Sequence, residues 1–204
     1  MQEENFKVTR KEAQQLARIP GNVKGAVILA NLEYVRQKGG KKAQEMIQKR
    51  LKELGYDISL QDIKPMNFYP EALSVLVILL AKEILKLDKA GIFEMGRLAL
   101  KVSIFVEPLL RFFVSPLKCF QQAPRYWKKQ LKVGELEAVK MDEEKKYAII
   151  RVKGYKFHPL ICDYHKGYFL QVAQTVLGKK NVEIEETKCV FKGDPYHEYI
   201  IRWQ

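Results

Sequence analysis

The stretch LICDYHKGYFLQVAQTVLGKKNVEIEETKCVFKGDPYHEYIIRW, residues 160–203, changes its hydrophobic period part-way along and thereby decides the fold. Its first part has apolar residues at helical spacing and ends at Gly178, which predicts a helix with a glycine stop. NVEIEETKCVF and YHEYIIRW then alternate apolar and polar residues, which predicts two strands. The run KGDP (192–195) between them is a strong turn signal, so the two strands should form a hairpin.

A second predicted hairpin precedes this stretch. GELEAVKM (134–141) and KYAIIRVKGY (146–155) are strand-like, and MDEEKK between them suits a turn. Two hairpins separated by one helix predict a mostly antiparallel four-stranded sheet in β-β-α-β-β order, with the helical N-terminal part packed on it. We therefore expect an α+β fold in one domain, residues 1–204, divided into a helical subdomain 1–130 and a ββαββ subdomain 131–204.

The first two-thirds of the chain are predicted to be helical. Thr9 and Glu12 have the spacing of a capping box, and Gly39-Gly40 predicts a break between two helices. Pro70 can open a helix that is apolar nearly all round, so this helix should be central and buried. Pro116 is expected to kink or end the helix that reaches it.

Composition indicates a globular protein with enough apolar material for a core. Of 204 residues, 47% are hydrophobic and 29% are charged. The longest apolar run, residues 72–81, is about half of what a membrane-spanning helix needs. The N-terminus is polar and unlike a signal peptide, and three widely spaced cysteines suit a reducing compartment. We therefore expect a cytoplasmic protein without a transmembrane segment.

A basic stretch lies just before the predicted sheet. The net charge is +12, and no acid occurs between Glu107 and Glu135. Such a stretch can bind phosphate, nucleic acid or an anionic surface, or it can be the solvated side of a helix in a lysine-rich protein. The candidate anion-binding residues are Arg111, Lys118, Arg125, Lys128, Lys129 and Lys132.

No motif for catalysis stands out. The glycine-rich phosphate loops, the nucleophile elbow and the zinc-protease motif are all missing from the sequence, and no pair of carboxylates differs from ordinary surface acids. We therefore predict no catalytic residues and expect that the protein is not an enzyme.

Four late residues have side chains that can bind a metal ion. Cys162 and His165 form C-x-x-H on a helix, and Cys189 and His197 form C-x7-H around the predicted turn. Together they could supply a tetrahedral zinc site, although seven intervening residues is loose spacing for such a pair. Buried cysteine also behaves as a small apolar residue, so we do not favour a metal and keep these four only as weak candidates.

Aromatic residues gather where the helical part should meet the sheet. An aromatic, apolar cavity there would suit a small hydrophobic ligand, although the same residues could simply form the core. The predicted pocket residues are Phe105, Leu109, Phe112, Phe113, Cys162, His165 and Phe169.

The end of the chain resembles 4-vinyl-reductase domains. These domains close with a strand ending in Glu-x-x-Cys, then Gly-Asp, then Cys-x-Phe. Glu186, Cys189, Gly193 and Asp194 match this pattern, whereas His197 stands where the second Cys would be. That departure weakens any role that needs two thiols.

The N-terminal part is similar to haem-nitric-oxide/oxygen-binding (H-NOX) domains in three stretches: VKGAVILANLEYVRQKGG (23–40), FYPEALSVLVILLA (68–81) and EMGRLALKVSIF (94–105). The same superfamily includes Golgi-tethering (TRAPP) subunits that bury a fatty acyl chain. The resemblance implies a hydrophobic pocket between helices and sheet, used for ligand sensing or assembly.

The haem motifs of H-NOX domains are missing. Residues 115–130 contain no histidine where the proximal ligand would stand, and Cys119 is the one conventional thiolate ligand there. The Tyr-x-Ser-x-Arg motif for the haem propionates is also missing. We therefore predict no cofactor and do not expect a histidine-ligated haem.

These observations favour a non-enzymatic sensor-type domain that binds an apolar or lipid-like molecule. One alternative is a structural or protein-interaction module without a ligand, for example a homodimer through its helices. A second alternative is binding of nucleic acid or an anionic surface through residues 111–132.

Overall fold

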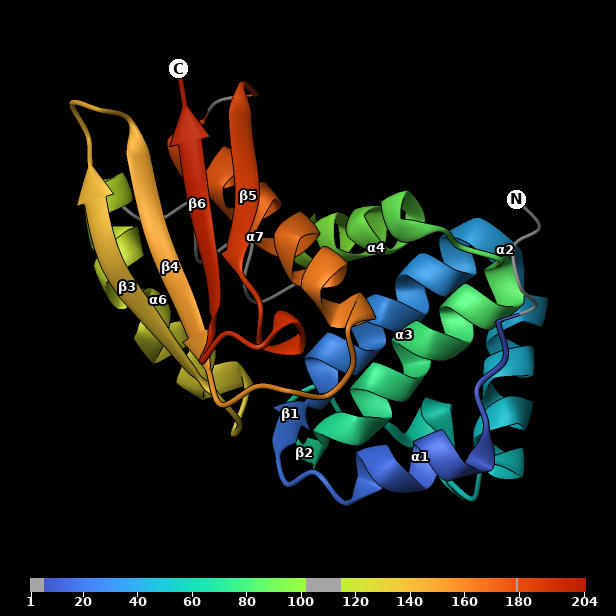
Figure 1. The fold of residues 1–204 in the computed structure, drawn as a ribbon. Coiled ribbons are helices and arrows are strands. Elements are labelled where there is room, and N and C mark those ends of the chain that lie inside the picture. The colour runs from blue at the N-terminus through green and yellow to red at the C-terminus, as the bar shows by residue number, and fades with distance from the viewer. Residues whose placement is uncertain (1–5, 102–114, 179) are drawn as a thin grey trace.

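The computed structural model describes residues 6–101, 115–178 and 180–204. Figure 1 shows helices α1 (Arg10–Ala17), α2 (Gly25–Glu53), α3 (Glu71–Leu85) and α4 (Lys89–Lys101) gathered on one side and a four-stranded sheet on the other. Helix α7 (Leu160–Leu177) runs between the two parts, and α6 (Pro116–Gln130) lies behind the sheet.

The sheet confirms the predicted α+β class. Strands β3 (Glu135–Asp142), β4 (Tyr147–Lys153), β5 (Val182–Lys188) and β6 (His197–Trp203) pair in the order β3-β4-β6-β5, and every pair is antiparallel. The two hairpins and the helix between them follow the predicted β-β-α-β-β order. The 3₁₀ turn η2 (Val190–Lys192) and Gly193, at φ +97°, connect the second hairpin.

Helix α3 is the centre of the helical part, as its all-round apolar sequence predicts. Every residue from Glu71 to Ala81 is buried. Element α2 consists of two helices that meet at a kink at Gly40, whose φ of +70° and ψ of −170° are not helical, so the predicted break is confirmed.

Two local features add detail to the predictions. Pro116 begins α6, and Ser115 caps this helix by accepting a hydrogen bond from the Lys118 N–H. The preceding helix, which we expected Pro116 to kink or end, lies outside the described residues. The loop before Pro70 contains an unpredicted strand, β2 (Phe68–Pro70), which pairs with β1 (Asn22–Lys24). These strands have three residues each, which is too short for a period to be recognised in the sequence.

Helices α4 and α7 cross at two glycines. A Cβ on Gly96 would lie 2.9 Å from the carbonyl carbon of Tyr164, and a Cβ on Gly167 would lie 2.8 Å from that of Phe93. In both cases the carbonyl oxygen would be closer still. Only glycine therefore lets the two backbones approach this closely, and the crossing joins the ββαββ part to the helical part.

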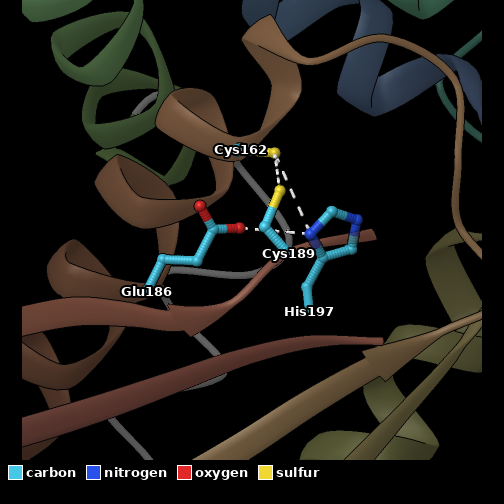
Figure 2. Close-up of side chains that lie close together, drawn as sticks. All are labelled: Cys162, Glu186, Cys189 and His197. Carbon is cyan, nitrogen blue, oxygen red and sulfur yellow. Dashed lines mark hydrogen bonds and ion pairs between the residues drawn. The ribbon is translucent and has the colours of Figure 1, made fainter. Parts of the chain in front are cut away.

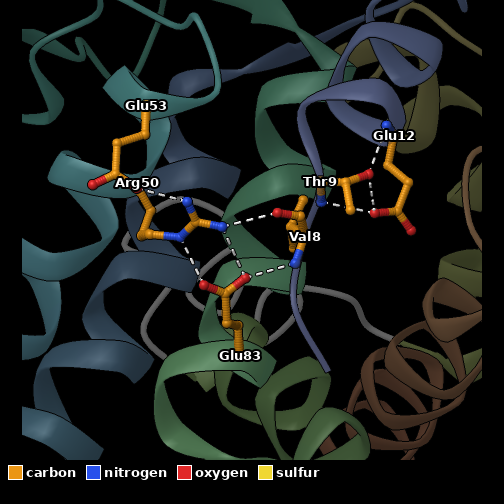
Figure 3. A network of polar contacts seen from close by, with 6 residues as sticks. All are labelled: Val8, Thr9, Glu12, Arg50, Glu53 and Glu83. Carbon is orange, nitrogen blue, oxygen red and sulfur yellow. Dashed lines mark hydrogen bonds and ion pairs between the residues drawn. The ribbon is translucent and has the colours of Figure 1, made fainter. Parts of the chain in front are cut away.

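The N-terminal segment is held by a network around Arg50 (Figure 3). Arg50 Nε donates to Glu83 Oε1 at 2.7 Å, and Arg50 Nη2 donates to the Val8 carbonyl at 2.8 Å. The Val8 N–H donates to Glu83 Oε2 at 2.6 Å. Thr9 and Glu12 then form the predicted capping box at the start of α1.

Within the described ranges, no helix combines the length and the apolar character needed to cross a membrane.

Candidate functional site

An apolar cavity of about 290 Å³ lies between the helices and the inner face of the sheet. Its walls come from helices α2, α3, α4, α6 and α7 and from strands β3, β4 and β6. Most side chains in these walls are aliphatic or aromatic, as is usual for a small-molecule site. They include Ala30, Ile78, Phe120, Trp127, Ile150, Tyr155, Tyr164, His165, Tyr168, Phe169, Ile201 and Trp203.

Aromatic rings surround His165 in the cavity wall. Its ring centroid lies 5.0 Å from that of Tyr155 and 5.7 Å from those of Trp127 and Phe169. Burial, followed by the nearby His197, lowers the pKa of His165 to about 3. His165 therefore contributes an uncharged ring to the wall at neutral pH.

Glu71, the first residue of α3, is a carboxyl group in this wall. Its side chain is 3% exposed, and burial raises its pKa to about 8, although the hydrogen bond from Tyr155 lowers it in part. The Tyr155 hydroxyl donates to Oε1, whereas the buried Oε2 has no hydrogen-bond partner within the described part of the chain. Nearby, the Tyr164 hydroxyl donates to Asn31 Oδ1 at 2.8 Å.

The predicted pocket residues have different positions. His165 and Phe169 line the cavity, whereas Cys162 is buried at the start of α7 and is not among the lining residues. The remaining four, Phe105, Leu109, Phe112 and Phe113, lie outside the described residues.

The described members of the basic stretch are exposed on and after α6. Lys129 lines the cavity, and its Nζ lies 5.2 Å from the centre of the Tyr126 ring. Lys132 lies over Phe68, and Lys128 is 3.5 Å from Glu135. Arg111 lies outside the described residues, and Lys118 and Arg125 are exposed. This placement is that of a solvated helix face, and anion binding by it stays a prediction.

A second site lies where α7 meets the hairpin of β5 and β6. Cys162, Glu186, Cys189 and His197 point toward one another there, as Figure 2 shows. One ligand atom from each lies within 4.8 Å of all the others. All four side chains are buried or half-buried, and the two sulfurs are free thiols.

Three of the distances within this cluster are close to those between the ligands of a tetrahedral zinc ion. Zinc bonds of about 2.3 Å to sulfur and about 2.1 Å to nitrogen or oxygen place two sulfurs about 3.8 Å apart, sulfur and nitrogen about 3.6 Å, and nitrogen and oxygen about 3.4 Å. The observed distances are 3.6 Å between the Cys162 and Cys189 sulfurs and 3.8 Å from Cys162 Sγ to His197 Nδ1. His197 Nδ1 lies 3.1 Å from Glu186 Oε1.

Surrounding hydrogen bonds orient two of the four side chains. His197 Nε2 donates to the Tyr155 carbonyl at 3.1 Å, so in a neutral ring the lone pair is on Nδ1, which faces the cluster. The Cys189 N–H donates to Asp194 Oδ2 at 2.8 Å, and the Cys189 carbonyl accepts from the Lys192 and Asp194 N–H groups. The KGDP turn therefore holds Cys189 in place.

The Glu186 carboxylate lies against His197 and forms an ion pair with that ring when the ring is protonated. Burial acts to raise the pKa of Glu186, but its hydrogen bonds and charged neighbours, with His197 the largest contributor, together outweigh burial and lower this pKa. Burial, followed by the charge of Glu186, raises the pKa of the Cys162 thiol. A metal ion would reverse this effect, because it stabilises a thiolate and accepts the carboxylate and the imidazole lone pair together.

Three of the four weak metal candidates are thus brought together, and the fourth is elsewhere. Cys162, Cys189 and His197 share the cluster, whereas His165 belongs to the cavity wall. Glu186 takes the place we gave to His165. The sequence reading marked Glu186 as part of a family pattern but did not count it as a ligand.

The fold and its two sites define a class of protein: an α+β domain with an apolar cavity between a helical part and an antiparallel sheet.

No family model matches the sequence, and no curated protein matches it significantly. Solved structures do match. An H-NOX protein from S. oneidensis in the Fe(II)NO ligation state superimposes with a TM-score of 0.68 at 12% identity, covering 89% of this chain and 99% of that chain.

A second match is an oxygen-binding H-NOX domain related to soluble guanylate cyclases, in its oxygen complex. Its TM-score is 0.61 at 13% identity, and the match covers 89% of this chain and 95% of that chain. These likenesses show that the chain has the H-NOX fold, in agreement with the resemblance of residues 23–105. At such identities they concern the fold alone.

Proposed function

We propose that this chain is a non-enzymatic, sensor-type domain that binds a small apolar or lipid-like molecule. The observation that carries the proposal is the cavity of about 290 Å³ with aliphatic and aromatic walls. An empty apolar cavity of this size would forgo many van der Waals contacts, and an apolar ligand would restore them. The shared fold supports the proposal, since the matched H-NOX proteins are described with bound NO or oxygen.

Haem does not fit the described residues of the cavity. Lys129 is the one cation among the described lining residues, whereas haem carries two propionates. Cys119 is the one thiol among the described lining residues, and His165 is enclosed by aromatic rings. We therefore propose a ligand other than haem. After incubation of the protein with haemin, a stoichiometric Soret band that survives gel filtration would contradict this proposal.

Direct analysis of bound molecules tests the proposed function. Protein purified without added ligand should release an apolar compound on denaturation, detectable by mass spectrometry of an organic extract. Both tryptophans of the chain, Trp127 and Trp203, line the cavity, so their fluorescence should change when an apolar probe binds. Absence of any extracted compound together with unchanged fluorescence across a panel of apolar probes would refute the proposal.

A specific observation favours a second function, which is zinc binding by the Cys162, Glu186, Cys189 and His197 cluster. Three measured distances agree with a zinc tetrahedron to within about 0.3 Å. The four side chains would form a closed structural site that joins α7 to the second hairpin. A site with four protein ligands leaves no open position for a substrate, so this role is consistent with a non-enzymatic domain.

Metal analysis tests the zinc proposal. The purified chain should contain about one zinc ion, and Glu186→Gln should reduce the occupancy or weaken the affinity. Glu185→Gln is the matched control, because Glu185 is the exposed neighbour on the same strand and pairs with Arg202. A metal-free protein that takes up no zinc, or a Cys162–Cys189 disulfide in freshly purified protein, would refute the proposal.

Two predictions from the sequence stay alternatives. A ligand-free interaction module would form a stable homodimer on gel filtration and yield no extracted compound. Nucleic-acid binding through the exposed basic residues near α6 would give a gel shift at low salt that weakens steeply as salt is added.

A further inference from the structure

The carboxyl group of Glu71 is the feature of the cavity that binding of an apolar molecule leaves unexplained. Glu71 is the one acid among the described lining residues, and its side chain is almost fully buried. Tyr155 satisfies Oε1, but Oε2 has no hydrogen-bond partner within the described part of the chain. A buried carboxyl with an unused oxygen costs free energy, so a ligand group that completes its hydrogen bonds would be favoured.

The groups around Glu71 favour a positively charged ligand. The Tyr155 hydroxyl, from the segment after β4, donates to Glu71, and Tyr164 on α7 is close enough to interact with it electrostatically while its hydroxyl donates to Asn31. Both hydroxyls stay protonated, because burial raises their pKa values. His165, whose ring centre lies 5.0 Å from that of Tyr155, is uncharged at neutral pH. The exposed Lys129 is the one cation among the described lining residues. A ligand with an anionic head group would thus be repelled by Glu71, and no buried cation among the described lining residues would offset that repulsion.

Two further features stabilise a cation beside Glu71. Aromatic rings attract an ammonium group through their negative faces, and Trp127, Tyr155 and Phe169 all contribute to the walls. Glu71 also stands at the first turn of α3, where the helix dipole favours the ionised carboxylate. The acid is therefore placed where pairing with an incoming cation can ionise it.

We propose that the cavity selects an apolar amine, whose ammonium group pairs with the carboxylate of Glu71 while its apolar part lies between the aromatic walls. This inference rests on the proposed function, because it names the ligand class of the same cavity. The ammonium keeps its proton, and the Glu71 carboxyl releases its own proton to solvent as the ion pair forms.

The proton released is a direct signature of this ion pair. Because the pKa of Glu71 is raised to about 8, the group is mostly protonated at pH 7, and nearly one proton should leave per amine bound. The affinity for an amine should rise between pH 6 and about 8 as Glu71 ionises, and it should fall above about pH 10 as the amine loses its own charge.

Three probes of equal size test the inference: 4-phenylbutylamine, 4-phenylbutanol and 4-phenylbutanoate. Binding is followed by tryptophan fluorescence, and proton release is measured by calorimetry at pH 7 in two buffers of different ionisation enthalpy. The variant Glu71→Gln removes the charge and keeps the shape of the side chain. Glu45→Gln, an exposed position on α2 outside the cavity, is the matched control.

We expect the amine to bind about 10- to 100-fold more tightly than the alcohol, because pairing with a buried charge contributes about 1.4–2.8 kcal/mol. Glu71→Gln should abolish this preference and the proton release while still binding the alcohol, and Glu45→Gln should behave as the parent. If the alcohol or the acid binds as tightly as the amine, or if Glu71→Gln keeps the preference, the amine inference is wrong and the proposed function stands. If none of the three binds, both are wrong. Should Glu71→Gln fail to fold, the absence of proton release from the parent on amine binding would still overturn the inference.

Discussion

Replacing Gly167 by alanine should force α7 away from α4. The new Cβ would lie 2.8 Å from the carbonyl carbon of Phe93, 3.2 Å from the Arg97 nitrogen, and closer still to the Phe93 oxygen. Ordinary contact for a Cβ begins near 3.4 Å. All three obstructing atoms belong to the backbone of a helix, so no side-chain rotation can relieve the clash, and the helices must separate by roughly 1 Å or more.

The expected cost combines two opposing terms. Overpacking of a close contact typically costs about 1–3 kcal/mol, and the loss of packing along the separated α4–α7 crossing adds roughly 2 kcal/mol. The higher helix propensity of alanine returns about 1 kcal/mol. We therefore expect a net loss of about 2–4 kcal/mol in the free energy of unfolding, and a similar loss for Gly96→Ala on the facing helix.

Urea unfolding followed by circular dichroism measures this loss. Gly91→Ala, on α4, is the control, since its Cβ would meet the Leu87 Cβ at 3.0 Å and Cδ2 at 3.1 Å, which requires a shift of only a few tenths of an ångström. This control should change stability by less than about 1 kcal/mol in either direction. Equal stability of the Gly167→Ala variant and the parent would refute the close crossing of α4 and α7. Because α7 carries Tyr164 and His165, probe binding in the cavity should weaken in Gly167→Ala as well.

Three further perturbations have defined outcomes. Removing zinc with a chelator, or substituting Cys189→Ser, should lower the free energy of unfolding by roughly 2–4 kcal/mol in a thermal melt, and no change on chelation would contradict a bound metal. Glu71→Gln should stabilise the ligand-free protein at pH 8 by about 1–3 kcal/mol and have little effect at pH 4. Because the pKa of Glu71 is raised, the folded state holds a proton that the unfolded chain releases, and the parent therefore loses stability as pH rises from about 4.5 to about 8. If the stabilisation of Glu71→Gln relative to the parent does not grow over this range, the result would contradict a buried acid. Glu83→Ala should cost about 2–4 kcal/mol in urea unfolding, because it leaves Arg50 and the Val8 N–H without their shared partner; a cost below about 0.5 kcal/mol would show that the network is solvated.

The parts of the fold that depend on local sequence signals could be predicted. Alternation in residues 134–155 and 181–203 identified both hairpins, and Gly39-Gly40 marked the kink in α2. Proline was ambiguous, because Pro116 can either end one helix or begin the next, and the choice depends on the cap that Ser115 supplies.

The sites depend on contacts between distant residues, so they were predicted only in part. Cysteine and histidine were recognised by type, but which of them meet follows from how α7 lies against β5 and β6. Cys162 and His165 are three residues apart on one helix, yet they face different neighbours. Glutamate is common on protein surfaces, so nothing in the sequence distinguishes Glu186 as a ligand or Glu71 as a buried acid until the packing is known.

Tyr155 belongs to both sites through different atoms. Its carbonyl accepts the hydrogen bond that orients His197 in the metal-type cluster, and its hydroxyl donates to Glu71 in the cavity wall. A shift of this one residue would therefore disturb both hydrogen bonds together. If both sites are occupied as proposed, binding of the small molecule in the cavity and binding of zinc in the cluster become linked equilibria. Each ligand must then change the affinity of the protein for the other ligand by the same factor. Zinc affinity would then report on the cavity without any measurement of the bound molecule itself.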